Sequence, residues 1–223
     1  MPVFRHRLAV QSLDLLCPDR SIPIRNCPMN TTHVEHPAAA ASARRAGRYT
    51  LPAVWLHWLL AAAILGIFAF GLYMVSLPFS PTKLRYMNWH KWAGILILSL
   101  SLLRLLWRIT HRPPPLPASM LQTMPRWQQW AHHGVHHAFY LLFFAVPLLG
   151  WAYSSAAGFP IVLFGQIPLP DFVPASPELA AAIKPWHKLS SFALIGLVVL
   201  HVAAVVKHQL IDRDGLLGRM RPW

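Results

Sequence analysis

Two histidines stand on one face of the last apolar run of the sequence. His187 and His201 are 14 residues apart. On a helix this spacing falls about 40° short of four full turns, so both side chains project the same way, about 21 Å apart along the axis. Imidazole is a ligand of haem iron, and two such positions at different depths indicate two stacked haem sites. The alternative is two independent polar residues that bond to neighbouring helices.

The elements that position these histidines are four long apolar segments. A helix needs about 20 mainly apolar residues to cross the hydrocarbon core of a membrane. Trp and Tyr stand at many of the segment ends, as in the aromatic belts of membrane proteins. The sequence therefore predicts an all-α fold, an integral membrane four-helix bundle with spans at about 51–75, 89–109, 130–153 and 186–206.

Composition and charge agree with a membrane protein. Apolar residues make up 55% of the chain and charged residues only 12%, whereas soluble domains carry about 25% charged residues. The net charge of +13 comes from basic residues that flank the apolar runs, so we do not expect a nucleic-acid partner. Basic residues are more frequent before the first run, between the second and third, and after the fourth. The positive-inside rule then places both termini in the cytoplasm.

Depth in the membrane limits which histidines can pair. The second and fourth runs both start outside, so His90 is the expected partner of His187 in the outer half. His201 lies in the inner half, where His57 is one candidate partner. The other candidates are the cluster at the start of the third run: His132, His133, His136 and His137. The residues alone leave this choice open.

Two glycines have the spacing to line haem sites. Gly71 is 14 residues after His57 and therefore faces the same way, at the depth of the outer site. Gly94 is one turn after His90. A missing side chain lets a flat macrocycle approach a helix closely. Ordinary packing of small residues between membrane helices is the alternative.

A haem-free metal site is the rival chemistry. Zinc favours three or four ligands at one depth, including thiolates or carboxylates, but the four runs contain neither cysteine nor acidic residues. The histidine cluster at the start of the third run does have i,i+4 spacing. Cys17 and Cys27 precede the first run and form no CxxCH pattern, so covalent haem attachment is not expected.

The segments outside the runs differ in character. Residues 1–47 are mixed and polar, and we expect a disordered arm or a translation start at Met29, followed by a membrane domain over 48–223. Three prolines at 113–115 predict a stiff inner loop. The proline-rich outer stretch from Ala156 to Pro185 is expected to be an ordered cap, with a short helix near Pro177 to Ile183.

Several stretches resemble the bacterial cytochrome b-561 family over residues 48–222. They are WLHWLL at 55–60, NWHKWAGILILSLSLLRLLWR at 88–108, HHAFYLLFFAVPLLGWAY at 136–153, PWHK at 185–188, LHVAAVVKH at 200–208 and DRDGLLGRMRP at 212–222. The resemblance implies a four-helix protein of the bacterial inner membrane that holds two non-covalent b haems. It assigns His57 with His201 to the inner haem and His90 with His187 to the outer haem.

The resemblance also implies the partners. Quinone is expected at one terminus of electron transfer, and superoxide is a possible donor at the outer face, where basic residues provide a positive field. Arg104, near the inner end, is a candidate to bind a haem propionate, because guanidinium pairs with carboxylate through two hydrogen bonds. No proton-abstracting catalytic residue is needed. The alternatives are the membrane anchor of a larger dehydrogenase or hydrogenase, and a haem-free metal transporter.

Overall fold

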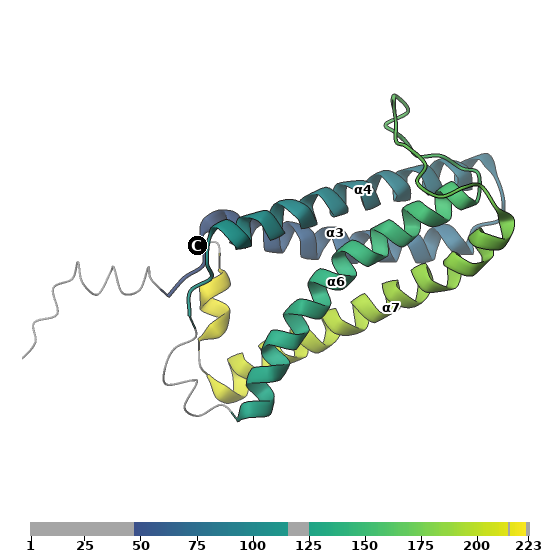
Figure 1. Cartoon of the computed structure of the whole chain (residues 1–223). Helices are drawn as coiled ribbons and strands as arrows, with labels where there is room; N and C mark the ends of the chain where they lie inside the picture. The colour runs from purple at the N-terminus through teal and green to yellow at the C-terminus, as the bar shows by residue number, and fades with distance from the viewer. Residues whose placement is uncertain (1–46, 116–124, 214, 222–223) are drawn as a thin grey trace, which may run out of the picture. The chain divides into compact units, whose positions relative to one another are not determined.

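The computed structural model describes residues 47–115, 125–213 and 215–221, with the side chains of 127 and 131–133 left out. Four long helices dominate this part of the chain (Figure 1). They are α3 (Leu51–Ser76), α4 (Pro81–Thr110), α6 (Arg126–Ala156) and α7 (Pro177–Lys207). The smaller elements are strands β1 (Val162–Leu163) and β2 (Ile167–Pro168), the π-helix η2 (His208–Asp212) and the 3-10 helix η3 (Leu216–Met220).

The four helices are long and apolar enough to cross a membrane, which confirms the predicted fold class. Helices α4, α6 and α7 begin earlier than the predicted spans, and in α4 and α7 a serine caps the first turn. The Ser80 hydroxyl accepts a hydrogen bond from the Lys83 N–H, and Pro81 starts α4. Ser176 caps α7 in the same way. The separate short helix predicted near 177–183 is therefore wrong, since those residues form the first turns of α7.

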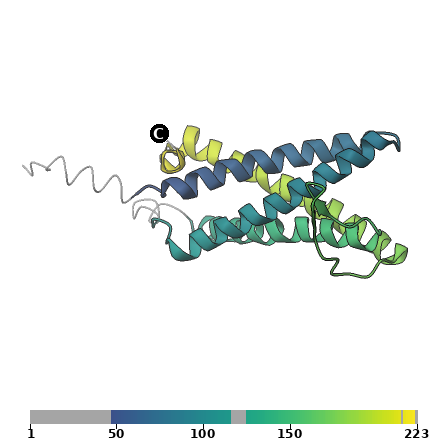
Figure 2. The ribbon, with the colours of Figure 1, turned by 90° about the horizontal axis from the view of Figure 1, so that it is seen from above.

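The helices pack as neighbours in the order α3, α4, α6, α7 (Figure 2). Their shared core is small and apolar and takes residues from every helix: Leu60, Ile64, Ile97, Phe139 and Leu194. Many other large apolar side chains point outward, among them Trp55 and Val199. Such a surface is costly in water and suited to lipid. Across the bundle, α3 also meets α7, where the Phe68 and Phe192 rings lie 5.3 Å apart.

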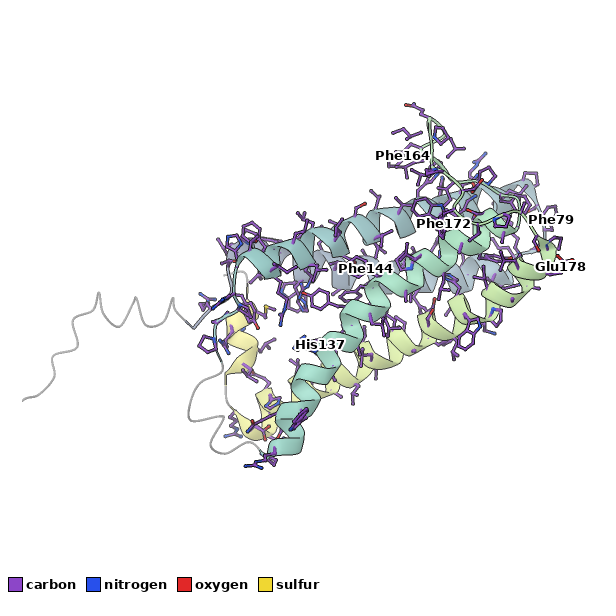
Figure 3. The ribbon with its side chains drawn as sticks, in the orientation of Figure 1. Phe79, His137, Phe144, Phe164, Phe172 and Glu178 are labelled. Atoms are coloured by element: carbon purple, nitrogen blue, oxygen red, sulfur yellow. The ribbon has the colours of Figure 1, made fainter. Side chains whose placement is uncertain are left out.

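Residues 157–176 cover one end of the bundle, which we call the cap end. An antiparallel hairpin pairs Val162 with Pro168 and Leu163 with Ile167 (Figures 1 and 3). Helix α4 holds it in place, because the Trp92 indole donates to the Val162 carbonyl at 2.7 Å and the Lys91 ammonium donates to two nearby carbonyls at 3.3 Å. The predicted ordered cap is present, but its strands were not predicted.

The opposite end, which we call the terminal end, brings both ends of the described chain together. Arg219 donates to the Gly47 carbonyl at 2.6 Å and to the Pro114 and Pro115 carbonyls at 2.9 Å. The Trp58 indole donates to the carbonyl of Met220 at 2.9 Å. One guanidinium therefore joins the start of the domain, the proline loop and η3. The predictions made for the arm and for Met29 concern residues outside the described part.

Candidate functional site

Two histidines face each other at the cap end. The ring centroids of His90 on α4 and His187 on α7 are 6.4 Å apart, with the ring planes at 90°. The Nδ1 atom of His187 lies 3.0 Å from the Val146 carbonyl oxygen. A carbonyl only accepts, so Nδ1 must carry the proton and donate it. This bond fixes the tautomer and leaves the Nε2 lone pair of His187 available to a metal.

Each of these imidazoles rests against a glycine of a neighbouring helix. A Cβ atom at Gly71 of α3 would stand 3.0 Å from Cε1 of His90. One at Gly150 of α6 would stand 3.0 Å from Cε1 and 3.3 Å from Nδ1 of His187. Gly71 therefore lies at the depth of His90, and an imidazole occupies the space beside it where a macrocycle was expected. At Gly94 a Cβ atom would meet no atom within 4 Å.

A second pair lies at the terminal end. The ring centroids of His57 on α3 and His201 on α7 are also 6.4 Å apart, with the ring planes at 67°. Phe139 of α6 presents its ring edge-on to His201 at 5.5 Å. The positive charge of Arg104 acts on both His57 and His201. The two pairs thus occupy two depths, joined by α7.

Another imidazole lies near the terminal-end pair. The ring of His136 is 6.0 Å from that of His201, a separation close to that of His57. Ring distances alone therefore leave both His57 and His136 as candidate partners of His201. His137 is exposed on α6 (Figure 3), and the side chains of His132 and His133 lie outside the described part.

A cavity of about 180 Å³ opens beside the terminal-end pair. Its lining includes four arginines and no acidic residue, together with His136 and Tyr140. The arginines are Arg48, Arg104, Arg108 and Arg112. Nη1 of Arg104 is buried and lacks a hydrogen-bond partner within the described structure. A buried guanidinium nitrogen without a hydrogen-bond partner can donate to an anionic group.

The geometry of each histidine pair fits a single metal bound between two imidazoles. Two imidazoles that bind one metal from opposite sides, each about 2 Å from it, have ring centroids about 6 Å apart. Both pairs have this separation. Among the described side chains, which do not include those of His132 and His133, no group of three or more histidine, cysteine or acidic residues is placed to hold a metal ion.

A family model described as prokaryotic cytochrome b561 matches residues 48–223. The chain belongs to this family. Among its relatives, Cytochrome b561 homolog 2 of Escherichia coli K12 is 34% identical over 184 residues, covering 78% of this chain and 90% of the relative. The Probable superoxide oxidase CybB of Yersinia pestis is 29% identical, covering 78% of this chain and 96% of the relative. Cytochrome b561 homolog 1 of Escherichia coli K12 is 30% identical, covering 78% and 97%.

Membership of the cytochrome b561 family implies haem b binding in a membrane protein. Several residues at the site were not predicted from the sequence. Gly150 is one of them, although a glycine at the outer depth of an apolar run was a signal equal to that of Gly71. Phe139 and the Val146 carbonyl gave no signal, because their roles depend on how α6 is rotated about its axis.

Proposed function

We propose that this cytochrome b561 binds two non-covalent b haems and carries electrons between a donor at the cap end and quinone. His90 and His187 would hold one haem, and His57 and His201 the other. The observation that supports the proposal is the equal separation of 6.4 Å between the ring centroids of the two pairs. Sites built independently for ordinary packing have no reason to share that spacing.

The surroundings of both histidine pairs fit a b haem. At the cap end, the Val146 carbonyl orients His187 as a neutral ligand, and the open space at Gly94 leaves room beside His90. At the terminal end, the unpartnered nitrogen of Arg104 suits a haem carboxylate.

A bound b haem supplies one-electron iron chemistry whose potential depends on its axial ligands and on nearby charge. A haem held by two histidines would favour electron transfer over oxygen chemistry, because both ligands would come from the protein. Arg104 would favour the reduced state through its positive charge. The fixed tautomer of His187 keeps one ligand geometry through the redox change.

The electron donor is expected on the outside of the inner membrane, with both termini in the cytoplasm. This orientation places the cap end outside. Lys83 and Lys91 hold positive charge there, fixed by backbone carbonyls of the loop after α3 and of the cap. A positive field steers anions, and one relative is named a probable superoxide oxidase. We therefore propose superoxide as the donor to test first.

The test is a haem count in purified protein, with reduced-minus-oxidised spectra, for the wild type, His90→Ala and His57→Ala. We expect two haems per chain in the wild type and about one in each variant. His137→Ala, an exposed histidine on α6, is the matched control and should retain both. A wild type without haem would overturn the proposal. Two haems in His57→Ala would transfer the ligand role to His136.

A second measurement tests the direction of transfer. Superoxide generated in the sample should reduce the haems in the wild type, and added quinone should reoxidise them. If reduced haem persists in the presence of quinone, the quinone part of the proposal is wrong while the haem part stands.

A further inference from the structure

Two buried hydrogen-bond donors on α6 have no partner in the described structure. They are Nε1 of Trp151 and the hydroxyl of Ser155. Ser155 is only 2% exposed. Buried polar groups are nearly always hydrogen-bonded, so each such atom requires an explanation. An indole N–H can only donate, and the missing partner must therefore be an acceptor.

A tryptophan and a serine at the same end of the bundle do have hydrogen-bond partners, so the lack of partners is specific to Trp151 and Ser155. The Trp92 indole, at the same end of the bundle, donates to the Val162 carbonyl. The hydroxyl of Ser154 donates to the Phe159 carbonyl. The cap therefore supplies acceptors to Trp92 and Ser154 but, within the described structure, none to Trp151 or Ser155. Phe172 covers Trp151, with ring centroids 5.1 Å apart, and helps to shield this position from solvent.

The two unpartnered donors lie beside the cap-end pair. Trp151 follows Gly150, which packs directly against the ring of His187. Ser155 is four residues later on the same face of α6, one turn closer to the cap. Both donors therefore lie at or beyond the level of Gly150, the glycine against His187, toward the cap.

We propose that Trp151 and Ser155 bind a carboxylate of the cap-end haem. The proposal rests on the proposed function, since it requires a haem at that pair. A carboxylate accepts several hydrogen bonds, and the indole N–H and the serine hydroxyl can each donate one to it. The site differs from that of Arg104 because both donors are neutral. They orient the carboxylate and partly offset its charge without adding a positive one.

The test compares Trp151→Phe and Ser155→Ala with the matched controls Trp92→Phe and Ser154→Ala, using redox titration of each haem. Trp151→Phe keeps the ring that meets Phe172 and removes only the N–H. Without the donors the carboxylate is more negative and favours ferric iron. We expect the cap-end midpoint potential to fall in both variants. The double variant should approach a tenfold change in the reduction equilibrium, about 59 mV for one electron. The controls should not change it.

Thermal unfolding of the haem-free protein gives a second readout. A buried hydroxyl without a partner is unfavourable, so Ser155→Ala should leave the haem-free melting temperature unchanged or raise it, and lower that of the haem-loaded protein. Ser154→Ala should lower both. An unchanged potential in Trp151→Phe and Ser155→Ala, as expected if ordered water fills the position, would overturn the inference. So would an equal fall in the controls. Absence of haem from the wild type would instead refute the proposed function.

Discussion

The two histidine pairs share one ring separation and differ in what surrounds them. At the cap end, backbone features hold the imidazoles: two glycines leave room for the rings, and a carbonyl binds Nδ1 of His187. At the terminal end, side chains do so, with Phe139 and His136 next to His201 and Arg104 close to both rings. At the cap end, the Lys83 and Lys91 ammonium groups donate to loop carbonyls, while the second site adjoins a cavity lined by four arginines.

This difference predicts a direction for electron transfer between the two proposed haems. Positive charge near an iron stabilises its reduced state. The arginines lie at the terminal end, and the donors proposed for the cap-end haem are neutral. The terminal-end haem should therefore have the higher midpoint potential. Electrons entering at the cap end would then move favourably toward the terminal end.

The largest effect should come from filling the glycine behind His187. In Gly150→Ala, the new Cβ would press on a ring that its bond to Val146 prevents from moving. We expect loss of most of the cap-end haem, so that the count per chain falls from two toward one. Gly71→Ala should lose less, because Nδ1 of His90 has no partner in the described structure and the ring can shift.

The control for these glycines is Gly134→Ala, on the same helix as Gly150, where a Cβ would meet no atom within 4 Å. It should retain both haems. Loss of the terminal-end haem from Gly150→Ala would mean that the two sites are not independent, and the comparison would fail.

Removing the buried charge at the terminal end should have the next largest effect. A unit charge about 10 Å away, at an effective dielectric constant of about 20, is worth roughly 1.7 kcal/mol. In Arg104→Gln, the terminal-end midpoint potential should therefore fall by on the order of 70 mV, somewhat more than a tenfold change in the one-electron reduction equilibrium. Redox titration would measure this. Arg108→Gln, at an exposed position one turn away, should shift it less. Equal shifts in both haems would contradict a local role for Arg104.

His136 gives a smaller and more specific test. Its ring is as near to His201 as that of His57, but only one of them can complete the pair. If His57 is the ligand, His136→Ala retains two haems and shifts only the terminal-end potential. A count near one in His136→Ala, with two in His57→Ala, would exchange the two roles.

Much of this arrangement could be predicted from the sequence. The spacing of His187 and His201 and the depth of each run bring together in the structure the rings that were expected to meet. Depth could not separate His57 from His136, since both lie at the same level and the choice depends on helix rotation. The early starts of α4 and α7 were readable, because a serine followed by proline is a common start for a helix. The β1–β2 hairpin could not be predicted, since strands of two residues are too short to show an alternation of apolar and polar residues.

The smallest effect should come from removing the hydrogen bonds of Arg219 at the terminal end. Arg219 holds three segments through hydrogen bonds to the Gly47, Pro114 and Pro115 carbonyls. Hydrogen bonds from a charged group contribute about 1.5–3 kcal/mol when buried, but these are only partly buried. Arg219→Gln should therefore cost roughly 1–2 kcal/mol of stability. The terminal-end haem should be released at a lower temperature, and cap-end release should stay unchanged. Earlier release of both haems would show that the two ends melt as one unit.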